Sequence, residues 1–385
     1  MNHSVLKTGL NISLKTVLSG LLALTVLLIS SRGHAENHTW VPEHANELVL
    51  SYQPSAQTPL NSNPETYSSE NWKQLQSAIY NLLNQSSYPG KSQLEQQAQV
   101  YISEWMSVVE KNNHSLTPKD VSQLKLFNAQ LLQKKHRFNE ALQELNSIPA
   151  NHQLYAQALL IESRIHHIQG HNDKARQSCG QLISQKLPLF AQLCLIETEA
   201  LSGQPEKAYQ LIKTFDKQYQ NSSDSVLTWY HQVAGSIARI LNKTTEAEQH
   251  FSFNLSQAPN SQWFQWADMA LNNGKADLVL TKMKQLEATD ITLEDGLIIR
   301  MARAEKVLGN NNKIQTLAKQ RIELRVKRSD QLHAADIAYY YIYIAPQPEQ
   351  ALNWAEKNWQ SVKEPADREL LTIAQQLNQK GVAHE

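Results

Sequence analysis

The sequence lacks the short motifs by which many enzymes are recognised. Its 385 residues contain no glycine-rich phosphate loop, no HExxH zinc motif, no nucleophile elbow and no pair of cysteines at redox spacing. Missing motifs lower the expectation of catalysis, although a site need not have a short signature. We therefore expect a protein that is not an enzyme and that holds no cofactor.

Long hydrophobic runs are also absent, apart from one near the N-terminus. Two lysines precede a 13-residue apolar run, residues 17–29, and small residues follow up to Ala35. A membrane-spanning helix needs about 20 apolar residues. The pattern therefore predicts a secretory signal peptide over residues 1–35, cleaved after Ala35, with a retained membrane anchor as the alternative. No cysteine stands at the cleavage site, so we expect a periplasmic or secreted protein with no integral membrane segment after signal removal.

The sequence has no excess of either sign of charge. It contains 36 basic and 36 acidic residues, and 33 basic against 36 acidic ones remain without residues 1–35. A chain so close to neutral gives no electrostatic footprint for nucleic acid. We expect no nucleic-acid partner.

Cysteine is scarce, and the two that occur are Cys179 and Cys194. Two cysteines supply too few ligands for a structural zinc site. In an exported protein their surroundings are oxidising, and they lie on adjacent predicted helices, so we expect a disulfide. A disulfide closing a loop of this length stabilises the fold by about 3 kcal/mol. The alternative is a pair of buried thiols that pack as small apolar residues.

One pattern occurs seven times in this chain: a turn-forming residue, followed five positions later by an apolar residue of a second helix. The apolar residues are Ala141, Ala175, Ala208, Ala247, Val279, Ile314 and Ala351, separated by 34, 33, 39, 32, 35 and 37 positions. The turn residues are His136, Gly170, Gly203, Asn242, Gly274, Gly309 and Pro346. A period near 34 with two helices inside it predicts a solenoid, in which each repeat packs only on its neighbours.

The clearest unit reads WYHQVAGSIARILNKTTEAEQHFSFNLSQAP, with Gly235 where two helices cross and with Ala247 and Phe251 on the second helix. This unit resembles the tetratricopeptide repeat, and the resemblance covers residues 122–361. The segments IQGHNDKARQSCGQL and ALNWAEKNWQSVKEPADRELL are similar to uncharacterised exported bacterial proteins of this repeat type. The family implies an all-α fold, a right-handed α-solenoid of helix pairs. Its inner face, lined by the first helix of each pair, binds peptides or protein segments.

The pattern also predicts the domain organisation. We expect an extended polar arm over residues 36–69, a helical hairpin over 70–116, about seven repeats over 117–361 and a C-terminal capping helix within 362–385. The long spacing of 39 positions predicts a loop insertion at residues 221–225, or a hinge between two halves.

Two helix starts are predicted from capping residues. Ser92 and Glu95 predict a capping box, in which each side chain bonds to a backbone NH of the other. Thr117, Pro118 and Asp120 supply a capping hydroxyl, a proline at the first helical position and an acid near the positive end of the dipole.

Helical phase places polar, aromatic and arginine residues on the inner face. They are Gln130, Gln133, Arg164, His167, Glu197, Trp229, Gln232, Arg239, Phe264, Asp268, Arg303, Lys306, Asp336, Tyr340 and Tyr343. Arginines and aromatics dominate protein-binding hot spots. We predict that a protein or peptide ligand carrying an acidic group contacts seven residues: Arg164, Trp229, Arg239, Arg303, Lys306, Tyr340 and Tyr343. The alternative for each is an ordinary solvated helix surface.

Two other clusters of residues, one of histidines and one of basic residues, do not predict a binding site. His166, His167 and His171 do not share one helix face, so we expect satisfied or solvent-facing histidines and no metal. A basic run of Lys319, Arg321, Arg325, Lys327 and Arg328 lies on a second helix, and a solvated convex face is expected there, with acidic lipid or lipopolysaccharide contact as the alternative.

The sequence thus favours an exported or periplasmic scaffold that binds envelope proteins through its concave face. An accessory role in envelope polysaccharide synthesis or export is the alternative. An enzyme with an unrecognised site is the third hypothesis.

Overall fold

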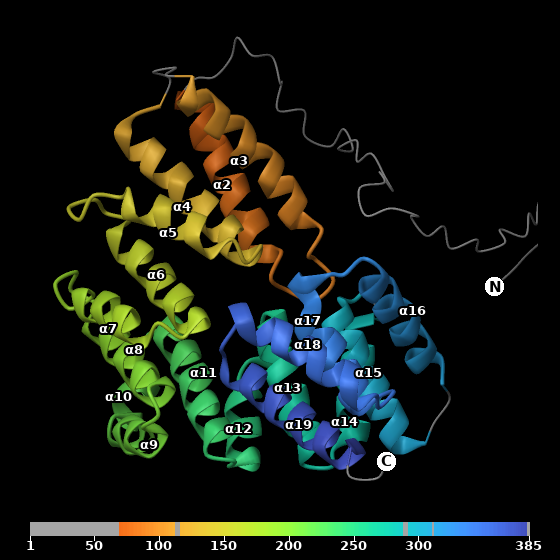
Figure 1. The fold of residues 1–385 in the computed structure, drawn as a ribbon. Helices are drawn as coiled ribbons and strands as arrows, with labels where there is room; N and C mark the ends of the chain where they lie inside the picture. The colour runs from red at the N-terminus through yellow and green to blue at the C-terminus, as the bar shows by residue number, and fades with distance from the viewer. Residues whose placement is uncertain (1–68, 112–115, 288–291, 310–311, 383–385) are drawn as a thin grey trace, which may run out of the picture. The chain divides into compact units, whose positions relative to one another are not determined.

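The computed structural model describes residues 69–111, 116–287, 292–309 and 312–382, all within one compact unit, Tyr52–Glu385. The predicted signal peptide and the predicted arm, apart from Ser69, lie outside the described residues. Every regular element described is helical (Figure 1). Among these helices none is both long and apolar enough to span a bilayer.

The helices follow one another in antiparallel pairs. The N-terminal hairpin is α2 (Ser69–Gln85) with α3 (Leu94–Glu110). Seven pairs follow: α4 (Pro118–Lys134) with α5 (Phe138–Asn146), α6 (Tyr155–Gln169) with α7 (Asn172–Gln181), α8 (Pro188–Leu201) with α9 (Pro205–Thr214), α11 (Asp224–Ile240) with α12 (Thr244–Phe251), α13 (Asn260–Asn272) with α14 (Ala276–Glu287), α15 (Asp295–Leu308) with α16 (Lys313–Lys327), and α17 (Ala334–Tyr343) with α18 (Pro348–Ser361). The last helix is α19 (Pro365–Val382), and two short 3-10 turns are η2 (Leu255–Gln257) and η3 (Gln331–His333). The expected all-α solenoid of helix pairs is confirmed for the described residues.

The turn inside six of the seven pairs contains a left-handed residue at the predicted position. These residues are His136, Gly170, Gly203, Asn242, Gly274 and Gly309, with φ between 56° and 88°. At the Asn242 turn, the amide of Lys243 bonds to the carbonyl of Ala238 at 2.8 Å, which satisfies a carbonyl that the end of α11 leaves free. The seventh turn has Pro346, whose ring excludes a positive φ.

The core is a chain of apolar clusters, each shared by neighbouring pairs. Of the seven apolar residues that define the repeat spacing, six are fully buried, and only Ile314 is partly exposed. The cluster between α4, α5 and α6 also includes Val362, which follows α18. A residue near the C-terminus therefore packs into the core of the first repeats.

The two predicted helix starts have different outcomes. Thr117 and Asp120 form a complete capping box at the start of α4, as predicted. The predicted box at Ser92 is wrong, because α3 begins at Leu94 without a side-chain cap. The carboxylate of Glu294 instead accepts bonds from the amides of Gly90, at 2.8 Å, and Ser92, at 3.2 Å. This distant carboxylate takes the place of the local cap.

The extra residues of the 39-position spacing are not a plain loop insertion at 221–225. They form a short helix, α10 (Asp216–Gln220), and α11 already begins at Asp224. Tyr219 on α10 is fully buried and donates a hydrogen bond to Gln192 at 2.7 Å. The insertion is therefore packed into the repeat that contains it.

The expected disulfide is present between Cys179 on α7 and Cys194 on α8, whose Cα atoms are 5.5 Å apart. Both residues are fully buried in a cluster with Leu159, Leu182 and Ala191. The bond joins the second helix of one pair to the first helix of the next.

Candidate functional site

The described residues enclose a concave cavity of about 1440 Å³. Residues from the first helix of all seven pairs line it, and α3, the end of α18 and α19 complete the wall. The inner face implied by the repeat resemblance is therefore the wall of this cavity, hereafter the central cavity.

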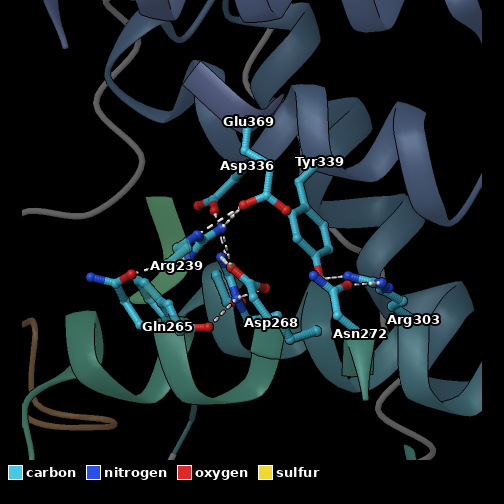
Figure 2. A network of polar contacts seen from close by, with 11 residues as sticks. Arg239, Gln265, Asp268, Asn272, Arg303, Asp336, Tyr339 and Glu369 are labelled. Atoms are coloured by element: carbon cyan, nitrogen blue, oxygen red, sulfur yellow. Dashed lines mark hydrogen bonds and ion pairs between the residues drawn. The ribbon is translucent and has the colours of Figure 1, made fainter. Parts of the chain in front are cut away.

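A buried network of charges forms one side of the central cavity (Figure 2). Arg300 on α15 donates two hydrogen bonds to the carboxylate of Asp268 on α13, at 2.9 and 3.0 Å, and a third to the carbonyl of Gly296 at 2.8 Å. The guanidinium also lies 4.5 Å from the centre of the Phe264 ring. A bidentate geometry of this kind fixes both side chains.

Arg239 on α11 extends the network to the last helix. Its guanidinium lies 2.8 Å from Glu369 on α19 and 3.7 Å from Asp268, and it donates to the amide oxygen of Gln265 at 3.1 Å. Its side chain is only 6% exposed. The acid that an external ligand was expected to bring to Arg239 is thus supplied by this chain.

Arg303 is satisfied by neighbouring helices as well. It donates to the hydroxyl of Tyr339 at 2.9 Å and to Asn272 at 2.8 Å, and its guanidinium lies 3.8 Å from the centre of the Tyr343 ring. The arginines on this wall therefore hold α13, α15 and α17 together.

The pKa directions follow from burial and pairing. Burial alone would raise the pKa of Asp268, but Arg300 and Arg239 outweigh it and hold that pKa below its usual value. Burial raises the pKa of Asp336, which lies 4.0 Å from Arg300. Burial also raises the pKa of Tyr339, so its hydroxyl remains protonated at neutral pH.

Another part of the lining of the central cavity is aromatic. Phe190 on α8 and Trp229 on α11 lie with ring centroids 5.8 Å apart, and Leu160 on α6 also lines this wall. These three side chains are half-buried. The half-buried amide of Gln232 lies on the same lining. This part of the lining offers apolar surface and an amide group to a ligand.

The segment between α18 and α19 closes the cavity wall against α6. The amide of Lys363 donates to the carbonyl of Ile168 at 2.7 Å, and Glu364 forms an ion pair with Arg164. Asp367 accepts a hydrogen bond from Asn358 at 2.7 Å. Burial and the Glu364 carboxylate raise the pKa of Asp367 to about 7.

The seven predicted ligand-binding residues have different positions in the structure. Arg164, Trp229, Arg239, Arg303 and Tyr343 line the central cavity. Tyr340 is buried in the core at 5% exposure. Lys306 is exposed and donates to the carbonyls of Tyr343 and Ile344, at 3.1 and 2.9 Å, at the end of α17.

Sequence reasoning missed the contribution of the C-terminal residues Glu364, Asp367 and Glu369 to the cavity. The local signal for the start of α19 was visible, because Glu364-Pro365-Ala366-Asp367 has the same proline and acid spacing as the start of α4. Their position beside α6 and α11 depends on contacts across 200 and 130 residues. No local pattern in the sequence predicts that these residues lie beside α6 and α11.

The clustered histidines His166, His167 and His171 lie at the end of α6 and just before α7. Among the described residues no group of three or more His, Cys, Asp or Glu side chains is arranged to hold a metal ion. His166 and His167 are buried, and the Nε2 atom of His167 lies 2.8 Å from the Thr198 hydroxyl. A smaller cavity of about 550 Å³ contains His231 and His250, whose Nδ1 atoms are 3.0 Å apart. The Glu246 carboxylate beside them accepts from Tyr209.

The basic run on α16 is partly neutralised by this chain. Arg321 and Arg325 each bond to the carboxylate of Asp295 at 2.6 Å, and Arg325 also bonds to Asp330. Lys319 pairs with Glu323 at 3.7 Å. These contacts tie α16 to the start of α15, which weakens the alternative of a lipid-binding surface.

Comparison with known proteins adds little. No protein-family model matches this chain, and no curated protein matches it. A crystal structure of the TPR domain of P58(IPK) is similar over 81% of this chain and 98% of that chain, with 14% sequence identity and a TM-score of 0.22. A likeness at that level supports no argument about function.

Proposed function

We propose that this protein is an exported scaffold of the bacterial envelope that binds an extended protein segment in its central cavity. The observation that carries the proposal is the cavity itself, which is lined by the first helices of all seven pairs. Its volume of about 1440 Å³ exceeds the usual size of a small-molecule site. The N-terminal signal pattern and the disulfide support an exported location.

The lining favours an uncharged segment with an apolar side chain over an acidic one. Arg239, Arg300 and Arg303 are already matched by carboxylates and polar groups of neighbouring helices. Recruiting them to an acidic ligand would leave buried carboxylates unpaired, which costs several kcal/mol. Trp229 and Phe190 offer half-buried aromatic surface with no such penalty. Aromatic side chains of this kind are typical binding anchors.

Affinity capture tests the proposal with a matched pair of variants. Mature protein and its Trp229→Ala variant are used to capture proteins from detergent-solubilised envelope. Tyr80→Ala is the control, because Tyr80 is 59% exposed and is not part of the cavity wall. We expect a protein that the parent and Tyr80→Ala capture and that Trp229→Ala loses. Circular dichroism establishes that all three proteins are equally helical.

Calorimetry with peptides from the captured protein then locates the bound segment. A buried aromatic anchor is worth about 2 kcal/mol or more, so Trp229→Ala should weaken binding by at least tenfold. Equal affinities for parent and variant would contradict the cavity as the binding site. Retention of the protein on envelope polysaccharide, lost in Trp229→Ala, would support the polysaccharide alternative instead.

A further inference from the structure

Two histidines from adjacent helices meet in the smaller cavity of about 550 Å³. His231 on α11 and His250 on α12, hereafter the histidine pair, have their Nδ1 atoms 3.0 Å apart, which is hydrogen-bond distance. One ring must therefore carry a proton on Nδ1, and the other must leave its Nδ1 free to accept. The bond joins the first helix of this repeat to the second.

The surroundings of the histidine pair fix how the two rings share this proton. The ring of His231 stacks on Phe253, with centroids 4.0 Å apart, which holds its orientation. The Oε1 atom of Glu246 lies 3.9 Å from Nε2 of His250 and favours a proton on that nitrogen. His250 therefore accepts through Nδ1, and His231 donates to it.

A further proton cannot be accommodated in this arrangement. If His250 is protonated on Nδ1 as well, two N–H donors face each other across 3.0 Å and no acceptor remains between them. Two like charges at this distance also repel each other. The hydrogen bond between α11 and α12 is then replaced by a repulsive contact.

The ionisable groups around the histidine pair are largely engaged with one another. They come from α9, α10, α11 and α12, and they are Tyr209, Lys213, Asp216, Tyr230 and Glu246. Glu246 forms an ion pair with Lys213 at 2.6 Å, and Asp216 accepts a hydrogen bond from Tyr230. Neither carboxylate is therefore a dedicated counter-ion for a protonated histidine.

The pKa directions agree with this geometry. Burial and the neighbouring His250 lower the pKa of His231 to about 4. Burial and Lys213 lower the pKa of His250. Asp216 acts in the opposite direction on both rings, and Glu246 does so on His250, but neither outweighs burial.

We propose that the histidine pair is an acid-sensitive joint, which holds α12 against α11 while both rings are neutral and releases α12 when the pair takes up a proton. Phe251, the residue after His250, lines the central cavity and lies against Gly235 on α11. Release of α12 therefore also loosens this part of the cavity lining. The joint is a property of this chain alone, and its failure would leave the proposed function intact.

Amide hydrogen exchange of α12 at about pH 7.5 and about pH 5 measures the joint. In the released state each ring regains its ordinary pKa of about 6.5, which lies above its value in the folded protein. The released state therefore gains protons as the pH falls below 6.5 and becomes more populated. We expect the protection factors of residues 244–253, which correct for the intrinsic effect of pH on exchange, to fall by at least about tenfold. Those of residues 276–287 in α14 should not change.

His250→Asn is the matched variant, because its amide is neutral at every pH and lies near the position of the Nδ1 atom. Its α12 should retain most of its protection at about pH 5. His231→Asn removes the pair from the other helix and replaces His250→Asn if that variant does not fold. His171→Asn is the control, since His171 is exposed, and it should behave as the parent does.

Three outcomes would overturn the joint. One is equal protection of α12 at the two pH values in the parent. Another is an equal loss of protection in the parent and in the variants of the histidine pair, because the effect of acid would then come from other groups. The last is an equal loss in α14, which would show general acid unfolding instead of release of α12.

Discussion

Single buried charges determine how the repeats are joined around the central cavity. Asp268 is the shared acceptor, because it receives two of the hydrogen bonds of Arg300 and lies 3.7 Å from Arg239 (Figure 2). Its two arginine partners are 9% and 6% exposed, and Arg239 has a second carboxylate partner in Glu369. Asp268 on α13 therefore joins its helix to both α11 and α15.

Replacing this carboxylate should cost much more than replacing a surface one. We expect Asp268→Ala to lower the free energy of unfolding by about 3–5 kcal/mol, because the buried guanidinium of Arg300 loses the carboxylate to which it donates two hydrogen bonds. Glu199→Ala is the comparison, since Glu199 pairs with the more exposed Arg176 and Lys207, and at most about 1 kcal/mol should be lost there. Urea unfolding measures both. Similar losses would show that the buried network contributes no more than a surface pair.

Replacing two different glycines by alanine should change the stability of the protein in opposite directions, so each variant is a control for the other. A Cβ atom at Gly235 would lie 2.6 Å from the ring of Phe251, which confirms that the two helices of this repeat cross closely there. Gly235→Ala should therefore destabilise the protein by about 1–3 kcal/mol through overpacking. Gly180→Ala meets nothing within 4 Å and should stabilise α7 by up to about 1 kcal/mol. Thermal unfolding distinguishes the two, and a shift in the same direction for both would contradict the packing argument.

At the scale of helices, the disulfide joins α7 to α8. It lies within an apolar cluster, where Leu159 and Leu182 shield it from solvent. The spacing of the two cysteines closes a short loop, and the chain-entropy model gives about 3 kcal/mol for a loop of this length. The bond thus strengthens one junction of the solenoid.

Removal of the disulfide should destabilise the fold and leave it helical. The double variant Cys179→Ala, Cys194→Ala is expected to lose about 3 kcal/mol in urea unfolding. A reductant should lower the unfolding midpoint of the parent and have no effect on the double variant. If the parent were insensitive to the reductant and as stable as the variant, the bond would contribute nothing.

For the whole molecule, the junction between α18 and α19 makes stability depend on pH through Asp367. Several polar and charged groups act on this carboxyl, namely Asn358, the amide and carboxylate of Glu364, Arg239 and Arg164. Its pKa rises from 3.8 to about 7 in the folded state. The folded protein therefore retains a proton that the unfolded chain has lost. The contribution of protonated Asp367 to the stability of the fold is complete below about pH 4 and is lost as the pH rises towards 7.

Asp367→Asn isolates this effect, because asparagine is neutral at every pH. We expect the variant to gain stability relative to the parent as the pH rises from about 4 to 7, and the difference to be constant above that range. Urea midpoints of both proteins between pH 4 and 8 provide the measurement. Other titrating groups are common to the two proteins and cancel. A difference that does not change with pH, or that decreases, would contradict the raised pKa.

The sequence was sufficient where local rules decide the outcome. Six turn residues predicted from their spacing adopt left-handed φ values, and the Thr117 cap forms as expected. It was insufficient at Ser92, where local geometry favoured a capping box but the carboxylate of Glu294, 202 residues away, binds the amide instead. Tyr340 shows the same limit, because helical phase alone does not say which of two opposite helix faces a neighbour buries.

The sequence by itself determined the helix pairs of the repeats, the turns inside them and the cysteines that are joined, because each follows from interactions within one or two adjacent repeats. Only the tertiary structure decided which charges remain available in the central cavity. Arg164 pairs with Glu364 and Arg239 pairs with Glu369, through contacts that span 200 and 130 residues. In a solenoid such contacts depend on the accumulated rotation of every repeat between them, and small changes in helix packing add up along the chain. The periodic pattern of the sequence does not predict this accumulated rotation.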